Sequence, residues 1–73
     1  MTRAKFLKLA SGDRVRFAGD TQGRDDERRE HVGIVNGAPQ WFEREGFGYV
    51  PVHLPGANHN LAVHSYNVLG VES

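Results

Sequence analysis

Three of the four histidines, His53, His59 and His64, fall in the last third of the sequence and are the first candidates for metal binding or acid–base catalysis. A zinc site needs at least three converging ligands, and because the chain contains no cysteine they would be histidines and carboxylates. The spacing of these histidines matches no metal-binding signature. We therefore expect no metal and no cofactor, and we interpret the histidines as solvated or singly hydrogen-bonded side chains.

Other catalytic patterns are weak. The adjacent carboxylates of "DDERRE" lie in a polar segment, whereas paired acid–base catalysis needs one carboxyl group removed from water. The glycine-containing stretches "GAPQW" and "EGFGYV" lack the lysine or the helix that completes a phosphate-binding loop. The sequence thus predicts a protein that is not an enzyme and has no small-molecule substrate.

The segment "QWFEREGFGYV" concentrates four large rings, Trp41, Phe42, Phe47 and Tyr49, within nine residues. A domain of this size cannot bury all four. Trp41 and Phe42 point to opposite sides if the segment is extended, and we expect Trp41 and Tyr49 to be exposed near Arg44. Exposed aromatic rings beside arginine are typical of binding surfaces. In the alternative, Phe42 and Phe47 plug the ends of the domain while Trp41 covers an edge or packs against a second copy. The predicted partner-binding residues are Trp41, Arg44, Phe47, Tyr49, His64 and Tyr66.

The chain of 73 residues predicts one small domain with a limited core. It contains no apolar run long enough to span a membrane, and its basic N-terminus has too short an apolar part for a secretory signal. We expect a cytoplasmic location.

Nine glycines and three prolines separate short runs of alternating apolar residues, which is typical of a small all-β domain. "RVRF" (14–17) predicts the first strand, and the polar segment 19–30 a long solvated loop. Further strands are predicted at 31–35, 49–54 and 61–66, and the last one follows a single tight turn in "HSYNV". Pro51 cannot donate to a ladder, so its strand should lie at an edge or bulge there.

Five strands this short must curl around their own apolar face. We therefore predict an all-β fold: a basic N-terminal arm at 1–10, and a single five-stranded barrel at 11–73 with a 3-10 turn before its last strand. The predicted core is Val15, Phe17, Val32, Ile34, Val50, Val52, Leu54, Leu61, Val63, Val68, Leu69 and Val71.

The order "GDRVRF", long polar loop, "GIV", turn, "GYVPV", loop and "LAVHSYNVLGVE" resembles the SH3-like small barrels. The opening is similar to KOW-type barrels. The pattern is also similar to the accessory barrels of photosystem I, of ferredoxin–thioredoxin reductase and of the nitrile hydratase β chain. The resemblance covers residues 11–72, and it implies that the long loop and the following hairpin flank an aromatic groove.

"GDRVR" at 12–16 also resembles the opening of the type II plasmid dihydrofolate reductase, a tetramer of such barrels. That family binds folate and cofactor with a Val-Gln-Ile-Tyr strand and a lysine just after "GDRVR". A placement without gaps puts Ala62 at the glutamine, His64 at the tyrosine and Phe17 at the lysine. The aliphatic positions are retained and the polar functional ones are not, so reductase activity ranks third among the functions considered.

The formal net charge is zero, but the N-terminal quarter is basic. The leading hypothesis is a non-catalytic interaction module. It would bind a protein partner or a second copy of itself through the 19–30 loop and the 41–49 hairpin. In the alternative, the barrel binds nucleic acid, with rings stacking on bases and basic side chains tracking phosphates. Those basic residues are Arg3, Lys5, Lys8, Arg14 and Arg16.

Overall fold

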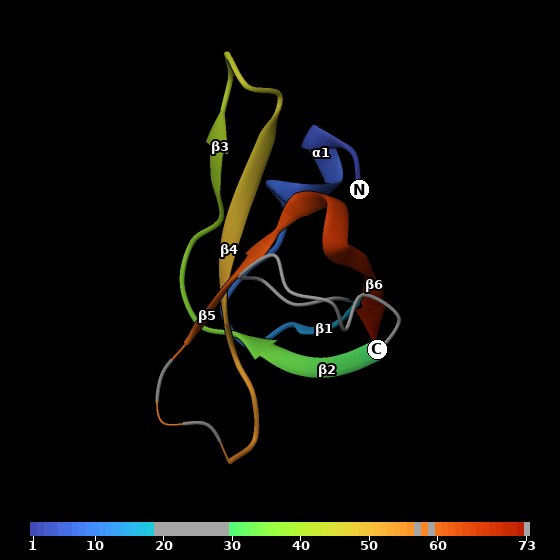
Figure 1. The fold of residues 1–73 in the computed structure, drawn as a ribbon, viewed down its shortest axis with the longest axis vertical. Helices are drawn as coiled ribbons and strands as arrows, with labels where there is room; N and C mark the ends of the chain where they lie inside the picture. Colours follow the sequence, from blue (N-terminus) through green and yellow to red (C-terminus); the bar gives the residue numbers. More distant parts are fainter. Residues whose placement is uncertain (19–29, 57, 59, 73) are drawn as a thin grey trace.

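The computed structural model describes residues 1–18, 30–56, 58 and 60–72. The loop predicted at 19–30 lies outside these residues except for Glu30, and so does His59. A short helix, α1, is followed by six strands and one 3-10 turn, η1 (Figure 1). Their bounds are α1 (Arg3–Phe6), β1 (Arg14–Ala18), β2 (Glu30–Val35), β3 (Gln40–Phe42), β4 (Phe47–His53), β5 (Leu61–His64), η1 (Ser65–Asn67) and β6 (Val68–Glu72).

All strand pairs are antiparallel, and β4 pairs with three other strands. β2 and β3 pair with β4 at its two ends, and β5 pairs with its middle. Beyond β2 the order continues through β1 to β6. The prediction of five strands omitted β3. A short connection separates β3 from β2, where Asn36 N donates to Pro51 O at 2.9 Å and Gly37, at a φ of 148°, lies over the Pro51 ring.

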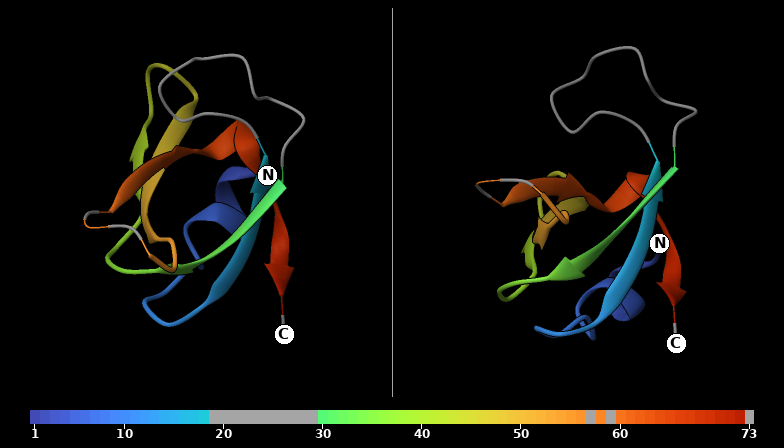
Figure 2. Two further views of the ribbon diagram at one scale, coloured as in Figure 1. Left: turned by 60° about the horizontal axis from the view of Figure 1, so that its bottom comes forward. Right: turned by 90° about the horizontal axis from the view of Figure 1, so that it is seen from below.

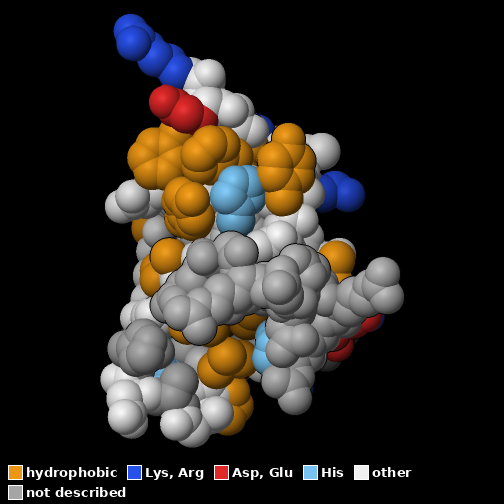
Figure 3. Space-filling view, in the orientation of Figure 1, with side chains coloured by type: hydrophobic (Ala, Val, Ile, Leu, Met, Phe, Trp, Pro, Cys, Tyr) orange, Lys and Arg blue, Asp and Glu red, His pale blue; other side chains and the backbone are white. Residues whose placement is uncertain are grey.

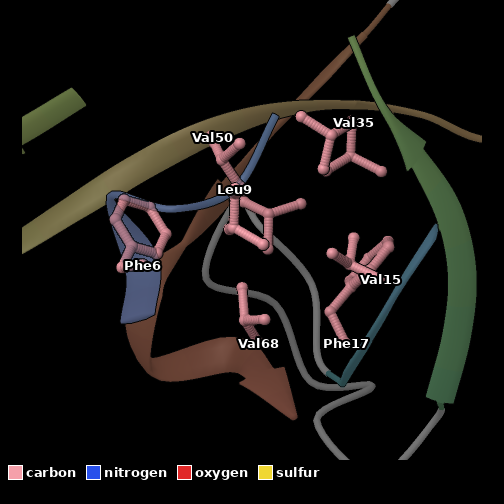
Figure 4. Close-up of a cluster of buried hydrophobic side chains, with 9 residues drawn as sticks. Phe6, Leu9, Val15, Phe17, Val35, Val50 and Val68 are labelled. Atoms are coloured by element: carbon pink, nitrogen blue, oxygen red, sulfur yellow. The ribbon is translucent and has the colours of Figure 1, made fainter. Parts of the chain in front are cut away.

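The sheet curls into a half-barrel around its apolar face (Figure 2). Of the predicted core, Val15, Phe17, Val50, Val52, Val63 and Val68 are buried, and Leu54 and Leu61 pack against them from partly buried positions. Seven of the nine buried side chains are labelled in Figure 4, and they converge from β1, β2, β4, β6 and the N-terminal segment. Alternation of aliphatic residues therefore identified most of the core correctly.

The predicted facing of β2 was wrong. Val32 is exposed and Ile34 half-buried, whereas Gly33 and Val35 point inward. A Cβ on Gly33 would collide with the Val52 side chain and lie 3.0 Å from His53 O, so the close crossing of β2 over β4 requires glycine there. Because the side-chain period of a strand is 2, placing Gly33 inside turns Val32 and Ile34 outward.

Leu69 and Val71 were also predicted inside, and both are exposed. They lie on β6, the last strand of the order. The pairing of β6 with β1 is irregular between Arg16 and Phe17, so Phe17 pairs with Val68 while Arg16 pairs with Gly70. This bulge keeps Val68 in the core and leaves the following apolar residues at the margin of the sheet.

The N-terminal segment, predicted as a basic arm, contributes Phe6 and Leu9 to the core. The Thr2 hydroxyl accepts from Lys5 N at 3.4 Å and caps α1. The guanidinium of Arg3 forms an ion pair with Glu43 at 2.8 Å, which joins α1 to the turn after β3. Residues 3–9 are therefore part of the packed unit.

The tight turn predicted before the last strand is present as η1. Among the described residues, no helix is long and apolar enough to cross a membrane.

Candidate functional site

The outer face of β3, β4 and β5 carries aromatic side chains in neighbouring register positions. Phe42 pairs with Phe47 across the β3–β4 hairpin, and Tyr49 pairs with His64 between β4 and β5. Because directly paired residues point to the same side of a sheet, these four rings share one face. Tyr66 of η1 extends the set, and we call Phe42, Phe47, Tyr49, His64 and Tyr66 the aromatic surface.

The rings of the aromatic surface contact one another continuously. Phe47 stacks on His64 with centroids 4.6 Å apart, and His64 stacks on Tyr66 at 5.2 Å with 8° between the ring planes. Tyr49 meets Phe47 and His64 edge-on at 5.7 and 5.3 Å. Phe42 closes the group at 5.9 Å from Phe47. Such stacked and edge-to-face pairs hold each ring in a defined orientation.

The aromatic surface is accessible to solvent. Tyr66 is 79% exposed and Phe42 40% exposed, while Phe47, Tyr49 and His64 are half-buried. Figure 3 shows hydrophobic side chains gathered around a histidine on the same end of the molecule as the β3–β4 hairpin. An exposed apolar patch of neighbouring side chains marks a contact surface more often than isolated exposed residues do.

Two hydrogen bonds position Tyr66. Its backbone N–H donates to Nδ1 of His64 at 3.0 Å, so the imidazole caps the first turn of η1. The buried hydroxyl of Ser65 accepts from Gly48 N at 3.1 Å and joins η1 to β4. A Cβ on Gly48 would meet Gln40 O and the ring of Phe6, so this close approach requires glycine.

Four of the six predicted partner-binding residues lie together, namely Phe47, Tyr49, His64 and Tyr66. Arg44 lies in the exposed turn between β3 and β4. Trp41 does not join them: it is half-buried and packs against Phe6, with centroids 5.7 Å apart. The ring that sequence reasoning placed inside, Phe42, takes the outer position. The pairing of Phe42 with Phe47 across the hairpin is the signal that would have predicted the outward position of the Phe42 ring.

The five basic residues of the nucleic-acid hypothesis are distributed over separate regions. Arg3 is paired with Glu43, and Arg16 lies 3.4 Å from Glu30. Arg14 and Arg16 are exposed on β1. Lys5 and Lys8 line a hollow between the N-terminal segment and β6. None of the five belongs to the aromatic surface.

The three histidines that the structure describes do not converge. His53 pairs with Ile34 of β2, His31 lies against the Phe17 ring, and His64 belongs to the aromatic surface. Within the described ranges, no three His, Asp or Glu side chains are grouped as metal ligands. The arrangement is suited to contact through ring faces and edges.

No protein-family model, curated protein or solved structure matches this sequence.

Proposed function

We propose that this protein is a non-catalytic interaction module, an SH3-like small barrel whose aromatic surface binds a protein partner. The observation that carries the proposal is the continuous contact of five rings on one exposed face. Aromatic residues bury a large area for little loss of side-chain entropy, and they are enriched among the residues that dominate binding energy.

The internal packing of the aromatic surface supports this function. Ring contacts and the His64 cap fix the orientation of Tyr66 before a partner arrives. A surface that is ordered in advance loses less entropy on binding than a flexible one. Water covering these rings is released on contact, which favours association.

The residues aligned with the type II reductase site support a role without catalysis. Phe17, at the lysine position, is buried in the core, and Ala62, at the glutamine position, has no hydrogen-bonding side chain. Positioning of folate and a nicotinamide needs polar groups at these places.

Differential affinity capture tests the proposal. The wild-type protein and the double variant Phe42→Ser/Tyr66→Ala are immobilised and exposed to lysate of the source cell, and retained proteins are quantified by mass spectrometry. The matched control is Leu69→Ser, because Leu69 is an exposed apolar residue of β6 that lines the hollow beside the N-terminal segment and is not one of the five rings. We expect a specific protein that the wild type and Leu69→Ser retain and the double variant loses.

Retention of the same proteins by all three forms would contradict the proposal. Recovery of nucleic acid that is lost steeply between 50 and 200 mM salt would favour the nucleic-acid alternative instead. A dimer seen by sedimentation that Phe42→Ser dissociates would identify the partner as a second copy.

A further inference from the structure

A shallow hollow continues the aromatic surface along β4. Its cavity volume is about 270 Å³, and its lining includes Tyr49, Pro51 and Ala62 together with Gln40 and Asn60. Tyr49 belongs to both features. Pro51 pairs with Ala62 one step further along the same outer face, where the side chains change from large rings to small groups. The hollow is therefore a depression beside the larger rings of the aromatic surface.

The hollow is large enough for an aliphatic side chain but smaller than most small-molecule sites. Sites for small molecules and cofactors usually enclose about 300–1,000 Å³, and this volume falls below that range. The Pro51 ring, the Ala62 methyl group and the Tyr49 ring present carbon to an occupant. An aliphatic side chain matches these walls.

Two side-chain amides flank the hollow. Nδ2 of Asn36 donates to Oδ1 of Asn60 at 3.2 Å, which holds the Asn60 amide in place. The described part of the chain provides no hydrogen-bond partner for the Gln40 amide or for Nδ2 of Asn60. Each primary amide supplies donors, and Gln40 also supplies an acceptor, so together they match the backbone of a polypeptide.

Charge and length further restrict the occupant. No charged residue lines the hollow or belongs to the aromatic surface, among the residues that the structure describes. Removing a neutral segment from water against such a surface costs less free energy than removing a charged segment. The outer face from Phe47 to Pro51 spans four steps of a strand, about 13 Å, which accommodates four or five residues of extended chain.

We propose that the partner is recognised through an extended, uncharged polypeptide segment with an aliphatic side chain in the Pro51–Ala62 hollow. The segment's next inward-facing side chain, two residues along and about 7 Å away, lies over the rings. Gln40 and Asn60 bond to the backbone between them. This assignment rests on the proposed function, since it uses the same surface.

Selection from a phage-displayed library of random octapeptides tests the assignment. The library is selected separately on the wild type, Tyr66→Ala, Ala62→Leu and Ala4→Leu. Ala62 is exposed, so leucine there fills the hollow without entering the core. Ala4→Leu adds the same atoms at an exposed position of α1 and is the matched control. Folding of each variant is verified by its amide NMR spectrum.

We expect the peptides selected on the wild-type protein to share an aliphatic position, to carry few charges and not to bind Tyr66→Ala. Binding to Ala62→Leu should fall at least tenfold, while Ala4→Leu should bind as the wild type does. Peptides that need Tyr66 but lack an aliphatic position, or bind Ala62→Leu equally well, would overturn this assignment and leave the proposed function standing. Absence of any peptide that depends on Tyr66 would also overturn it, whereas the proposed function is judged separately by the capture experiment.

Discussion

The rings of His64 and Tyr66 lie parallel, with 8° between their planes, and the backbone N–H of Tyr66 donates to Nδ1 of the same imidazole at 3.0 Å. One side chain thus serves both as the cap of η1 and as the support for the most exposed ring of the surface. Two variants separate these roles. His64→Ala removes the cap and the stack, whereas the amide oxygen of His64→Asn can still accept from Tyr66 N.

We expect His64→Ala to lower the free energy of unfolding by about 1 kcal/mol through loss of the cap. His64→Asn should retain most of that stability, and both variants should weaken partner binding because Phe47 and Tyr66 lose the ring between them. Urea denaturation gives the first quantity, and titration with a selected peptide gives the second. Equal destabilisation by Asn and Ala would show that the Nδ1 acceptor does not stabilise η1.

Ser65→Ala tests the link between η1 and β4. The Ser65 hydroxyl is buried and accepts from Gly48 N, so its removal leaves a buried N–H without a partner. We expect a loss of about 1–3 kcal/mol in the free energy of unfolding. Ser11→Ala is the control, since Ser11 is exposed, and it should change stability by less than about 0.5 kcal/mol. Similar values for the two variants would contradict the proposed link.

Gly33→Ala tests the close crossing of β2 over β4. The added methyl group would collide with Val52 and approach His53 O, and we expect a destabilisation of about 1–3 kcal/mol. At Gly70 of β6 a methyl group would have no neighbour within 4 Å, so Gly70→Ala should be neutral or slightly stabilising. Thermal denaturation of both variants provides the comparison. A Gly33→Ala protein as stable as Gly70→Ala would contradict the close approach of β2 to Val52 of β4.

Phe6→Ala tests whether the N-terminal segment belongs to the core. Phe6 is fully buried and contacts the Trp41 ring, so its truncation should cost about 3–5 kcal/mol. That cost approaches the whole stability of a small domain, about 5 kcal/mol, and we expect a largely unfolded protein. Leu7→Ala, at a position 39% exposed, should remain folded. Trp41 fluorescence during denaturation measures both, and a stable Phe6→Ala protein would restore the interpretation of residues 1–10 as an arm.

The sequence indicated the all-β class and most of the core because aliphatic alternation survives in β1, β4 and β5. The prediction of the buried face was wrong at β2, where the pair Val32 and Ile34 is together more hydrophobic than the pair Gly33 and Val35. Hydrophobicity alone selected the wrong face there, since the reason for Gly33 is its nearness to Val52, far along the chain. The prediction that Leu69 and Val71 are buried was wrong for a related reason, because the bulge beside them depends on the pairing of β6 with β1.

The candidate site was partly predictable. The concentration of rings within 40–49 located three rings of the aromatic surface in advance, and "HSY" added His64 and Tyr66. The choice between Trp41 and Phe42 depended on which side of β3 faces Phe6, a residue that the sequence had assigned to an arm outside the barrel. Once Phe6 occupies the core, Trp41 packs against it, and Phe42 must face outward beside Phe47.

Calorimetry tests most directly whether the aromatic surface binds a partner. It measures the affinity of a captured protein or a selected peptide for the wild type and for Tyr66→Ala, with Leu69→Ala as the control. Tyr66 is 79% exposed, so its truncation should leave the fold intact. As a dominant contact residue it should weaken binding by about 2 kcal/mol, roughly 30-fold, while Leu69→Ala stays within about twofold of the wild type. Equal affinities of all three proteins would contradict a partner-binding role for the aromatic surface.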